Sequence, residues 1–508
     1  MLIYKKEIWV CAEIYSTIHV LSFSLQGKKK YDFSRKSERT TISHIAMLIL
    51  GVRIQRPFFA PSRCCLRIRC NFSTSSSPLQ APQHVEEDCV DFLPWLRQKA
   101  GEEISSVLSV GKSIHGRSLF ACKPIHAGDC ILKVPYRMQL APDNLLPSIS
   151  SLLGDDVTNV AKLALVILMH QKLGQASEWA PYISCLPPVS EMHSTIFWSD
   201  EELKMIKISS LYQETLKHKA QIEKDFSSIK HILEHFPEFF EEVTLDKFKH
   251  AYTLVESRGW ISTRGVSMIP FADFLNHDGF SETDVLSDDF QQVSEVIADQ
   301  NYAPGDEVLI RYGKFSNARL LLDFGFILLC NKYDQVKVEV NVPEHDHLRS
   351  IKLDLLERHT TPVLKDDNAL SLGNGFMVMK VKSSNGKGKG IPQSLRAFAR
   401  VLCCTSPQEL QELAMEARQN DGRLARIPLK NRGKELQAHQ FLLSRFNHII
   451  ENYNSLIQFV IRDSCSVSLG KDARRVEIAQ DLLNGELRIL KSASAWLKNY
   501  CETLKNKR

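Results

Sequence analysis

Cysteine motifs of the kind that hold a metal are missing from this chain. Its 13 cysteines are scattered, and neighbours such as Cys64 and Cys65 or Cys403 and Cys404 form no pair of CxxC units and no Cys/His cluster at zinc spacing. Structural zinc sites need such clusters. We therefore expect no metal site, and we expect the cysteines to be reduced thiols or small core residues.

Long apolar runs and a strong charge bias are also absent. No run approaches the roughly 18 to 20 apolar residues that span a bilayer, so we expect no membrane partner. The net charge of +5 is small for 508 residues, and the composition gives no argument for a nucleic-acid partner. Nothing in the sequence indicates an obligate dimer. We expect a soluble monomer with two or three domains.

The N-terminal segment 47–84 contains no aspartate or glutamate but has several arginines and a Ser/Thr cluster. This composition is typical of an organelle transit peptide, and a disordered basic tail is the alternative. The piece LRIRCNF resembles a plastid cleavage context. We expect residues 1–84 to be a leader that directs the protein to the chloroplast stroma, with the mitochondrion or the cytosol as alternatives. Residues 1–46 precede Met47 and are expected to be an upstream extension or a rarely used leader.

Hydrophobic periodicity predicts short strands and longer helices after this leader. Phe92, Trp95 and Leu96 fall at helical spacing, and the stretches 159–174 and 211–236 have the helical period. Strands are expected at 117–125, at 130–135 and twice within 293–313. The turn HAGD between the first two strands predicts a hairpin.

The C-terminal third is predicted to be a separate helical domain. A short helix within 314–328 should stop at Gly325, because glycine is the usual helix terminator. The lysine- and glycine-rich stretch 381–393 is typical of a flexible loop. Apolar stripes within 442–456 and 476–490 favour core packing over a coiled coil, because no heptad pattern persists.

The stretch SMIPFADFLNHDGF, residues 267–280, combines apolar bulk with Asp273, Asn276 and His277. A helix cap or a buried hydrogen-bond network would explain these polar residues. A metal site is disfavoured because no second His or Cys stands three or four residues from His277. A serine hydrolase is disfavoured because the chain has no G-x-S-x-G motif.

The order of four motifs decides between these alternatives. They are GRSLFACKPIHAGDCILKVP (116–135), ESRGW (256–260), IPFADFLNH (269–277) and PGDEVLIRYGKFSNARLLLDFGF (304–326). This order resembles the SET-domain methyltransferases, in the branch of Rubisco large-subunit lysine methyltransferase, which also includes the actin-histidine methyltransferase. The resemblance covers residues from about 90 to about 500. It implies an α/β (α+β) fold, in which a β-rich pseudoknotted SET core at 85–335 carries a helical insert at about 150–255. An all-helical substrate-binding domain follows at 336–508.

The resemblance implies that S-adenosylmethionine is the cofactor. Arg258 matches the arginine near the methionine carboxylate, and a guanidinium suits a carboxylate. Relatives often have a second glycine where this chain has Ser118. Tyr312 matches the catalytic tyrosine, whose hydroxyl can make weak CH···O contacts with the transferred methyl group. The implied cofactor-binding residues are His115, Gly116, Arg117, Arg258, Asn276 and His277.

The resemblance also implies a substrate site near Arg258, Ser262, Asp273 and Phe324. Asp273 matches a residue lining the site of the target amine. Two positions depart from the relatives: Ser262 stands where Rubisco-modifying enzymes have an arginine, and Phe324 replaces a second tyrosine. The missing hydroxyl can change the methylation state or the substrate.

The predicted function is methylation of a lysine in a non-histone, plastid protein. Many histone-modifying SET enzymes carry zinc-bound cysteines beside the domain, and this chain lacks them. The expected protein partner is the substrate that carries this lysine. Methylation of a protein histidine is one alternative, and a catalytically weak SET scaffold in a plastid complex is another.

Overall fold

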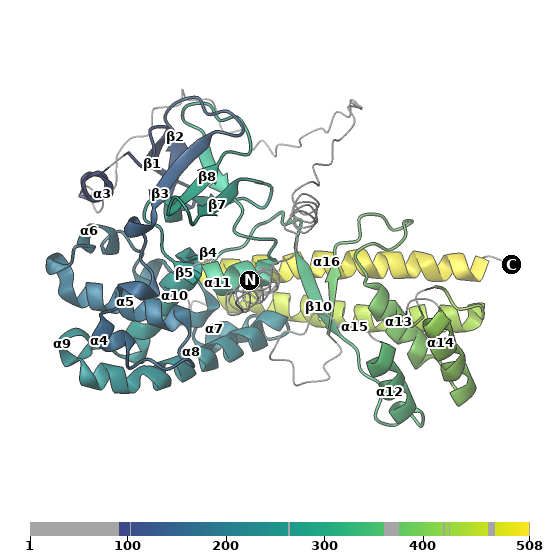
Figure 1. Ribbon diagram of the computed structural model, residues 1–508. Helices are drawn as coiled ribbons and strands as arrows, with labels where there is room; N and C mark the ends of the chain where they lie inside the picture. The colour runs from purple at the N-terminus through teal and green to yellow at the C-terminus, as the bar shows by residue number, and fades with distance from the viewer. Residues whose placement is uncertain are drawn as a thin grey trace, which may run out of the picture. The chain divides into compact units, whose positions relative to one another are not determined.

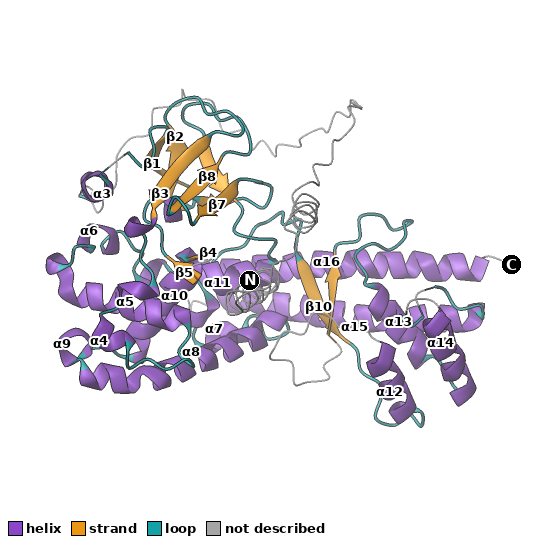
Figure 2. Ribbon diagram, in the orientation of Figure 1, coloured by secondary structure: helices purple, strands orange, loops and turns teal. Residues whose placement is uncertain are grey.

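The computed structural model describes residues 91–101, 103–262, 265–359, 375–419, 422–425, 427–465 and 473–506. The predicted leader lies outside these residues. Short strands occur among longer helices (Figures 1 and 2). The strands are β1 Leu108–Ser113, β2 Gly116–Ala121, β3 Cys130–Pro135, β4 Trp260–Ser262, β5 Gly265–Ser267, β6 Asn276–His277, β7 Asp284–Asp288, β8 Val293–Ile297, β9 Glu307–Ile310, β10 Gln335–Glu339 and β11 Gly375–Met379. The helices are α3 Phe92–Ala100, α4 Pro147–Ser150, α5 Asn159–Leu173, α6 Ala180–Ile183, α7 Asp200–Lys204, α8 Ser210–His235, α9 Pro237–Phe240, α10 Leu245–Arg258, α11 Asn317–Phe324, α12 Arg349–His359, α13 Gln393–Leu402, α14 Pro407–Gln419, α15 Arg432–Cys465 and α16 Ala473–Asn506.

The strands form small, separate sheets, and the mixed fold class is confirmed. One sheet has the order β1-β2-β9-β6 and another has the order β3-β8-β7. β2 therefore pairs with β1 and β9, whereas β3 pairs with β8. The predicted hairpin between 117–125 and 130–135 is wrong. A local turn signal does not fix pairing, because each strand finds the partner that buries its apolar face.

Helices α4 to α10 occupy the chain between β3 and β4, where a helical insert was predicted. The central helix α5 is buried in its middle, with every residue from Leu163 to Ile167 fully enclosed. The Thr158 hydroxyl caps α5 by accepting a hydrogen bond from the Ala161 backbone N–H at 3.1 Å. The predicted helices at 159–174 and 211–236 are both confirmed as α5 and α8. Helix α10 ends at Arg258.

The C-terminal part is built on two helices, α15 and α16, of 34 residues each. They pack along each other (Figure 1), with Leu442 and Phe446 of α15 and Leu483 and Leu490 of α16 fully buried. The expectation of an all-helical part is wrong in one detail, because β10 and β11 pair as an antiparallel two-stranded sheet. These strands are short and are separated by α12 in the sequence, so local patterns do not reveal their pairing.

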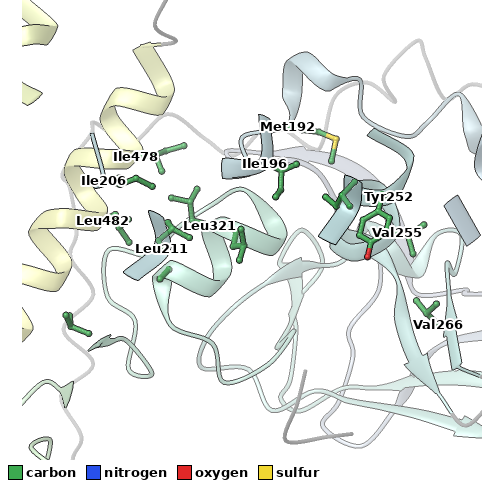
Figure 3. Packing of buried hydrophobic residues seen from close by; sticks show 14 of the residues in the cluster. Met192, Ile196, Ile206, Leu211, Tyr252, Val255, Val266, Leu321, Ile478 and Leu482 are labelled. Carbon is green, nitrogen blue, oxygen red and sulfur yellow. The ribbon is translucent and has the colours of Figure 1, made fainter. Parts of the chain in front are cut away.

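One hydrophobic cluster joins the helical insert to α16. Ile206 and Leu211 belong to the same buried cluster as Ile478 and Leu482 (Figure 3). Polar contacts reinforce this packing, since the Ser209 hydroxyl donates to Glu486 Oε1 at 2.8 Å. The insert and α16 therefore share one core.

The cysteines agree with the sequence prediction except at one position. Cys403, Cys404 and Cys501 are buried free thiols. Cys185 is disulfide-bonded, so the prediction of reduced thiols is wrong there. Within the described ranges, every helix is too short or too polar to span a bilayer.

Candidate active site

The parallel pairing of β6 with β9 brings together two predicted parts of the site. Asn276 stands opposite Leu309 and His277 opposite Ile310. The chain leaving β9 then places Tyr312 beside His277, because the Tyr312 backbone N–H donates to His277 Nδ1 at 3.0 Å. The two ring centroids are 5.1 Å apart. Burial lowers the pKa of His277 to about 4, which keeps Nδ1 an acceptor near neutral pH.

The Tyr312 hydroxyl has a fixed orientation. It donates to the Leu275 carbonyl oxygen at 2.7 Å, which leaves the lone pairs of the hydroxyl oxygen available to another group. Burial raises the pKa of Tyr312 to about 12, so the hydroxyl stays protonated. This residue can accept weak hydrogen bonds but cannot act as a base near neutral pH.

Aromatic rings surround Tyr312. Phe324, at the end of α11, lies with its ring centroid 5.0 Å from that of Tyr312, and Phe326 lies 6.4 Å away. Gly325 between them has φ +79°, and a β-carbon there would lie 2.8 Å from the Ser194 backbone nitrogen. Only glycine therefore fits this bend, which confirms the predicted helix stop. Aromatic faces of this kind attract cations.

The half-buried Arg258 forms an ion pair with the fully buried Asp273 carboxylate beside this group. Arg258 Nη1 donates to the Asp273 carbonyl oxygen at 3.0 Å and lies 3.5 Å from Asp273 Oδ2. The Tyr182 hydroxyl donates to the same Oδ2 at 2.9 Å. Asp273 Oδ1 is buried without a hydrogen-bond partner, and burial raises the pKa of this carboxyl group. The proposed contact of Asp273 with the target amine stays a prediction.

The turn between β1 and β2 holds the other predicted cofactor residues. His115 is exposed, and Gly116 has φ +95° with open space where a β-carbon would stand. Arg117 turns its guanidinium toward the protein, over the Phe274 ring at 4.9 Å. Asn276 Nδ2 donates to the Arg117 carbonyl oxygen at 3.2 Å, which ties this turn to β6.

Ser262 follows Arg258 in the sequence, and Phe271 precedes Asp273. Ser262 ends β4, and its side chain lies outside the described part of the chain. Phe271 has φ +73°, a conformation that costs a non-glycine residue about 1–3 kcal/mol. Such backbone strain is concentrated at functional sites, and here it lies two residues before Asp273.

The residues on these elements fit S-adenosylmethionine. Arg258 Nη1 donates its hydrogen bond to the protein itself. The Nε and Nη2 atoms donate to no group among the described residues, and they are accessible to solvent. These two donors can bind a carboxylate as a fork. The open space over Gly116 leaves room for a ligand against the backbone. In the described residues, no three His, Cys, Asp or Glu side chains are grouped to hold a metal ion.

The chain is similar to known proteins in sequence and in fold. Residues 343–490 match a family model described as Rubisco LSMT substrate-binding. The chain is 26% identical to a chloroplastic [fructose-bisphosphate aldolase]-lysine N-methyltransferase of Arabidopsis thaliana, over 88% of this chain and 89% of that protein. It is 24% identical to actin-histidine N-methyltransferase of Mus musculus, over 79% and 68% of the two chains. Rubisco LSMT bound to sinefungin and monomethyllysine superposes with a TM-score of 0.64 at 22% identity, over 83% of this chain and 93% of that one.

The chain is thus similar to Rubisco LSMT-like SET-domain methyltransferases in sequence and in fold. The resemblance and the fold class predicted from the sequence are thereby confirmed. The domain boundaries and the roles of the single site residues stay predictions.

Sequence reasoning missed two residues that contact the predicted site residues. Tyr182 lies in the helical insert, far from every motif, and contacts Asp273 only through the fold. Glu307 Oε1 accepts a hydrogen bond from Asn276 Nδ2 at 3.4 Å, across the pairing of β6 with β9. No local pattern marks Tyr182. Glu307 follows the Pro-Gly-Asp turn and could have been noted as the first residue of a predicted strand.

Proposed function

We propose that this protein transfers a methyl group from S-adenosylmethionine to a lysine side chain of a plastid, non-histone protein. The observation that carries the proposal is the convergence of Tyr312, His277 and Arg258 on one small region. A half-buried, protonated tyrosine side chain stands there next to a guanidinium with two available donors. The cofactor supplies a methyl group on a sulfonium, and the protein's task is to align it with the target nitrogen.

Each site residue has a physical role in this proposal. Arg258 holds the cofactor's carboxylate, and the backbone at Gly116 and at Asn276–His277 forms the rest of the cofactor site. The Tyr312 oxygen accepts weak CH···O contacts of about 0.5–1 kcal/mol each from the methyl group. Phe324 forms an aromatic wall near that hydroxyl, which suits an amine that becomes positively charged on methylation.

Lysine is favoured over histidine by the plant relatives, whose names describe lysine methylation of aldolase and methylation of the Rubisco large subunit in the chloroplast. The tobacco Rubisco enzyme is 27% identical over 52% of this chain and 56% of that protein. The actin-histidine relatives keep the histidine alternative open. Phe324 in place of tyrosine keeps the scaffold alternative open.

Labelled S-adenosylmethionine separates these alternatives. The protein without residues 1–84 is incubated with labelled cofactor and a stromal extract, and labelled peptides are sequenced by mass spectrometry. Label on lysine supports the proposal and label on histidine supports the first alternative. If the cofactor binds but no peptide is labelled, the scaffold alternative is supported.

The pH dependence of the rate gives an independent prediction. His277 with a pKa of about 4 and Tyr312 with a pKa of about 12 do not change charge near neutral pH. A target lysine must lose its proton, and the pKa of a solvent-exposed lysine is about 10.4. We expect the initial rate to rise steadily from about pH 7 to about pH 9, because the neutral fraction of the amine rises.

A histidine target would give a different profile. The pKa of a solvent-exposed histidine is about 6.5, so the rate would level off above about pH 7.5. Initial rates measured at constant ionic strength with saturating cofactor distinguish the two shapes. A plateau in this range would contradict methylation of lysine.

We also propose that residues 47–84 direct the protein to the chloroplast. The names of several plant relatives include the word chloroplastic, and the composition of this segment supports the same location. A fusion of residues 47–84 to a fluorescent reporter should be imported into chloroplasts. A diffuse cytosolic signal would contradict the proposal. The same segment with its arginines replaced by glutamine is the matched control.

The remaining proposals concern organisation and partners. The matched family model at residues 343–490 supports a helical substrate-binding domain at 336–508, and we place the SET domain at 85–335 before it. The partner is a protein substrate bound by a monomeric enzyme. Gel filtration of the purified protein measures the oligomeric state directly.

A further inference from the structure

Arg258 is held directly by Asp273 and indirectly by Tyr182, which contacts Asp273. Its Nη1 contacts both the carbonyl oxygen and the carboxylate of Asp273, which lies in the 3-10 turn Ala272–Phe274. The carboxylate is in turn held by the hydroxyl of Tyr182 on α6. Both Tyr182 and the Asp273 side chain are completely buried. Tyr182, Asp273 and Arg258 therefore form a chain of contacts from the helical insert to the edge of the site.

This chain constrains the guanidinium. A long arginine side chain has many rotamers, and fixing one of them costs free energy when a ligand binds. Here the contact at Nη1 fixes the rotamer before binding, while Nε and Nη2 donate to no group in the described residues. The Tyr182 hydroxyl sets the orientation of the carboxylate, because without it Asp273 Oδ2 would keep only its 3.5 Å contact with Arg258.

We propose that Tyr182 and Asp273 are positioning residues that hold Arg258 ready for the carboxylate of S-adenosylmethionine. The inference rests on the proposed function, because it assumes that the cofactor binds at this site. It gives Asp273 a role toward the cofactor, whereas the sequence suggested a role toward the target amine. It also extends the site into the helical insert.

Two ligands test the proposal by calorimetry on the full chain. S-adenosylhomocysteine has the carboxylate that Arg258 would bind, whereas 5′-methylthioadenosine lacks the amino-acid part and keeps the adenosine and the sulfur. We expect Tyr182→Phe to weaken the binding of S-adenosylhomocysteine by about 5- to 20-fold, because one hydrogen bond to a charged group is lost. We expect the binding of 5′-methylthioadenosine to change by less than about twofold, because it makes no contact with Arg258.

A double-mutant cycle tests whether Tyr182 acts through Arg258. Arg258→Gln should weaken the binding of S-adenosylhomocysteine by about 10- to 100-fold, because two charge-assisted hydrogen bonds are lost. Tyr182→Phe added to Arg258→Gln should then cause little further loss, because the residue on which it acts is absent. Asp273→Asn should follow the same pattern as Tyr182→Phe.

The matched control is Tyr252→Phe. The Tyr252 hydroxyl donates to the buried Asp225 carboxylate at 3.0 Å, so this variant removes the same kind of hydrogen bond within the insert. We expect it to leave the binding of both ligands unchanged.

Three outcomes would overturn the proposal. The first is an equal loss for both ligands in Tyr182→Phe, which indicates a general structural effect. The second is unchanged binding of S-adenosylhomocysteine in that variant, and the third is an additive loss in the double mutant. If the wild-type protein binds neither ligand, the proposed function itself fails, and this result is distinct from the other three.

Discussion

Replacing Tyr312 with phenylalanine is expected to lower kcat by about 10- to 100-fold and to change the KM for S-adenosylmethionine by less than about threefold. The hydroxyl is protonated, and its direction is set by the hydrogen bond to the Leu275 carbonyl oxygen. Its oxygen therefore acts on the methyl group during transfer, while the cofactor is bound mainly by other residues. A loss confined to kcat is the signature of an interaction made in the transition state. Initial rates with labelled cofactor measure both constants.

The control for this variant is Tyr333→Phe. Tyr333 lies outside the aromatic group around Tyr312, and its ring contacts the Lys332 ammonium at 5.0 Å. We expect wild-type kcat for this variant. Wild-type kcat in Tyr312→Phe would contradict a catalytic role for the tyrosine.

Replacing Glu435 with alanine is expected to lower the free energy of unfolding of the C-terminal helices by about 3–5 kcal/mol. Arg400 on α13 makes a bidentate pair with this residue, from Nε to Oε2 at 2.8 Å and from Nη2 to Oε1 at 2.7 Å. Both side chains are buried, so the variant leaves the Arg400 charge without its partner. Urea unfolding followed by Trp496 fluorescence measures the change, because Trp496 packs near this pair through His439.

The pH dependence of stability and a control variant test this prediction. Burial raises the pKa of Glu435, but the hydrogen bonds from Arg400 outweigh this effect, and the net pKa is lowered. A lowered folded-state pKa means that the stabilisation is present above the unfolded pKa of about 4.3 and is lost as pH falls below it. The control is Glu477→Ala, which breaks an exposed pair with Arg474 and should cost less than about 1 kcal/mol. Equal losses in the two variants would contradict a stabilising role for the buried pair.

Local patterns in the sequence were sufficient to predict the main helices and the end of α11. The 3.6-residue period of the apolar residues identified α5, α8, α15 and α16, because an amphipathic helix records its buried face in its own sequence. The stop at Gly325 could be predicted because only glycine adopts its backbone conformation there without strain.

Strand pairing and the buried polar contacts could not be predicted in the same way. β2 and β3 lie close in sequence but pair with β9 and β8, which follow the whole helical insert. The pairing of a strand depends on partners distant in sequence, and so does the partner of a buried hydroxyl. Tyr182 is an example, because 91 residues separate it from Asp273.

The motifs predicted which residues belong to the candidate site, but they did not predict the contacts between those residues. Asn276, His277 and Tyr312 are brought together by β6 and β9, as the order of the motifs implied. The direction of Arg117 toward the protein and the contact of Asp273 with Arg258 appear only in the folded chain. These contacts depend on three-dimensional packing, for which a single sequence holds no local signal.

The central claim is that Arg258, Asn276–His277 and Tyr312 form one cofactor site. The most direct measurement is a crystal structure of the protein with S-adenosylhomocysteine. We predict that the ligand's carboxylate lies within hydrogen-bonding distance of the Arg258 guanidinium and that its sulfur faces the Tyr312 hydroxyl. S-adenosylhomocysteine bound elsewhere, with neither Arg258 nor Tyr312 in contact with it, would contradict the claim.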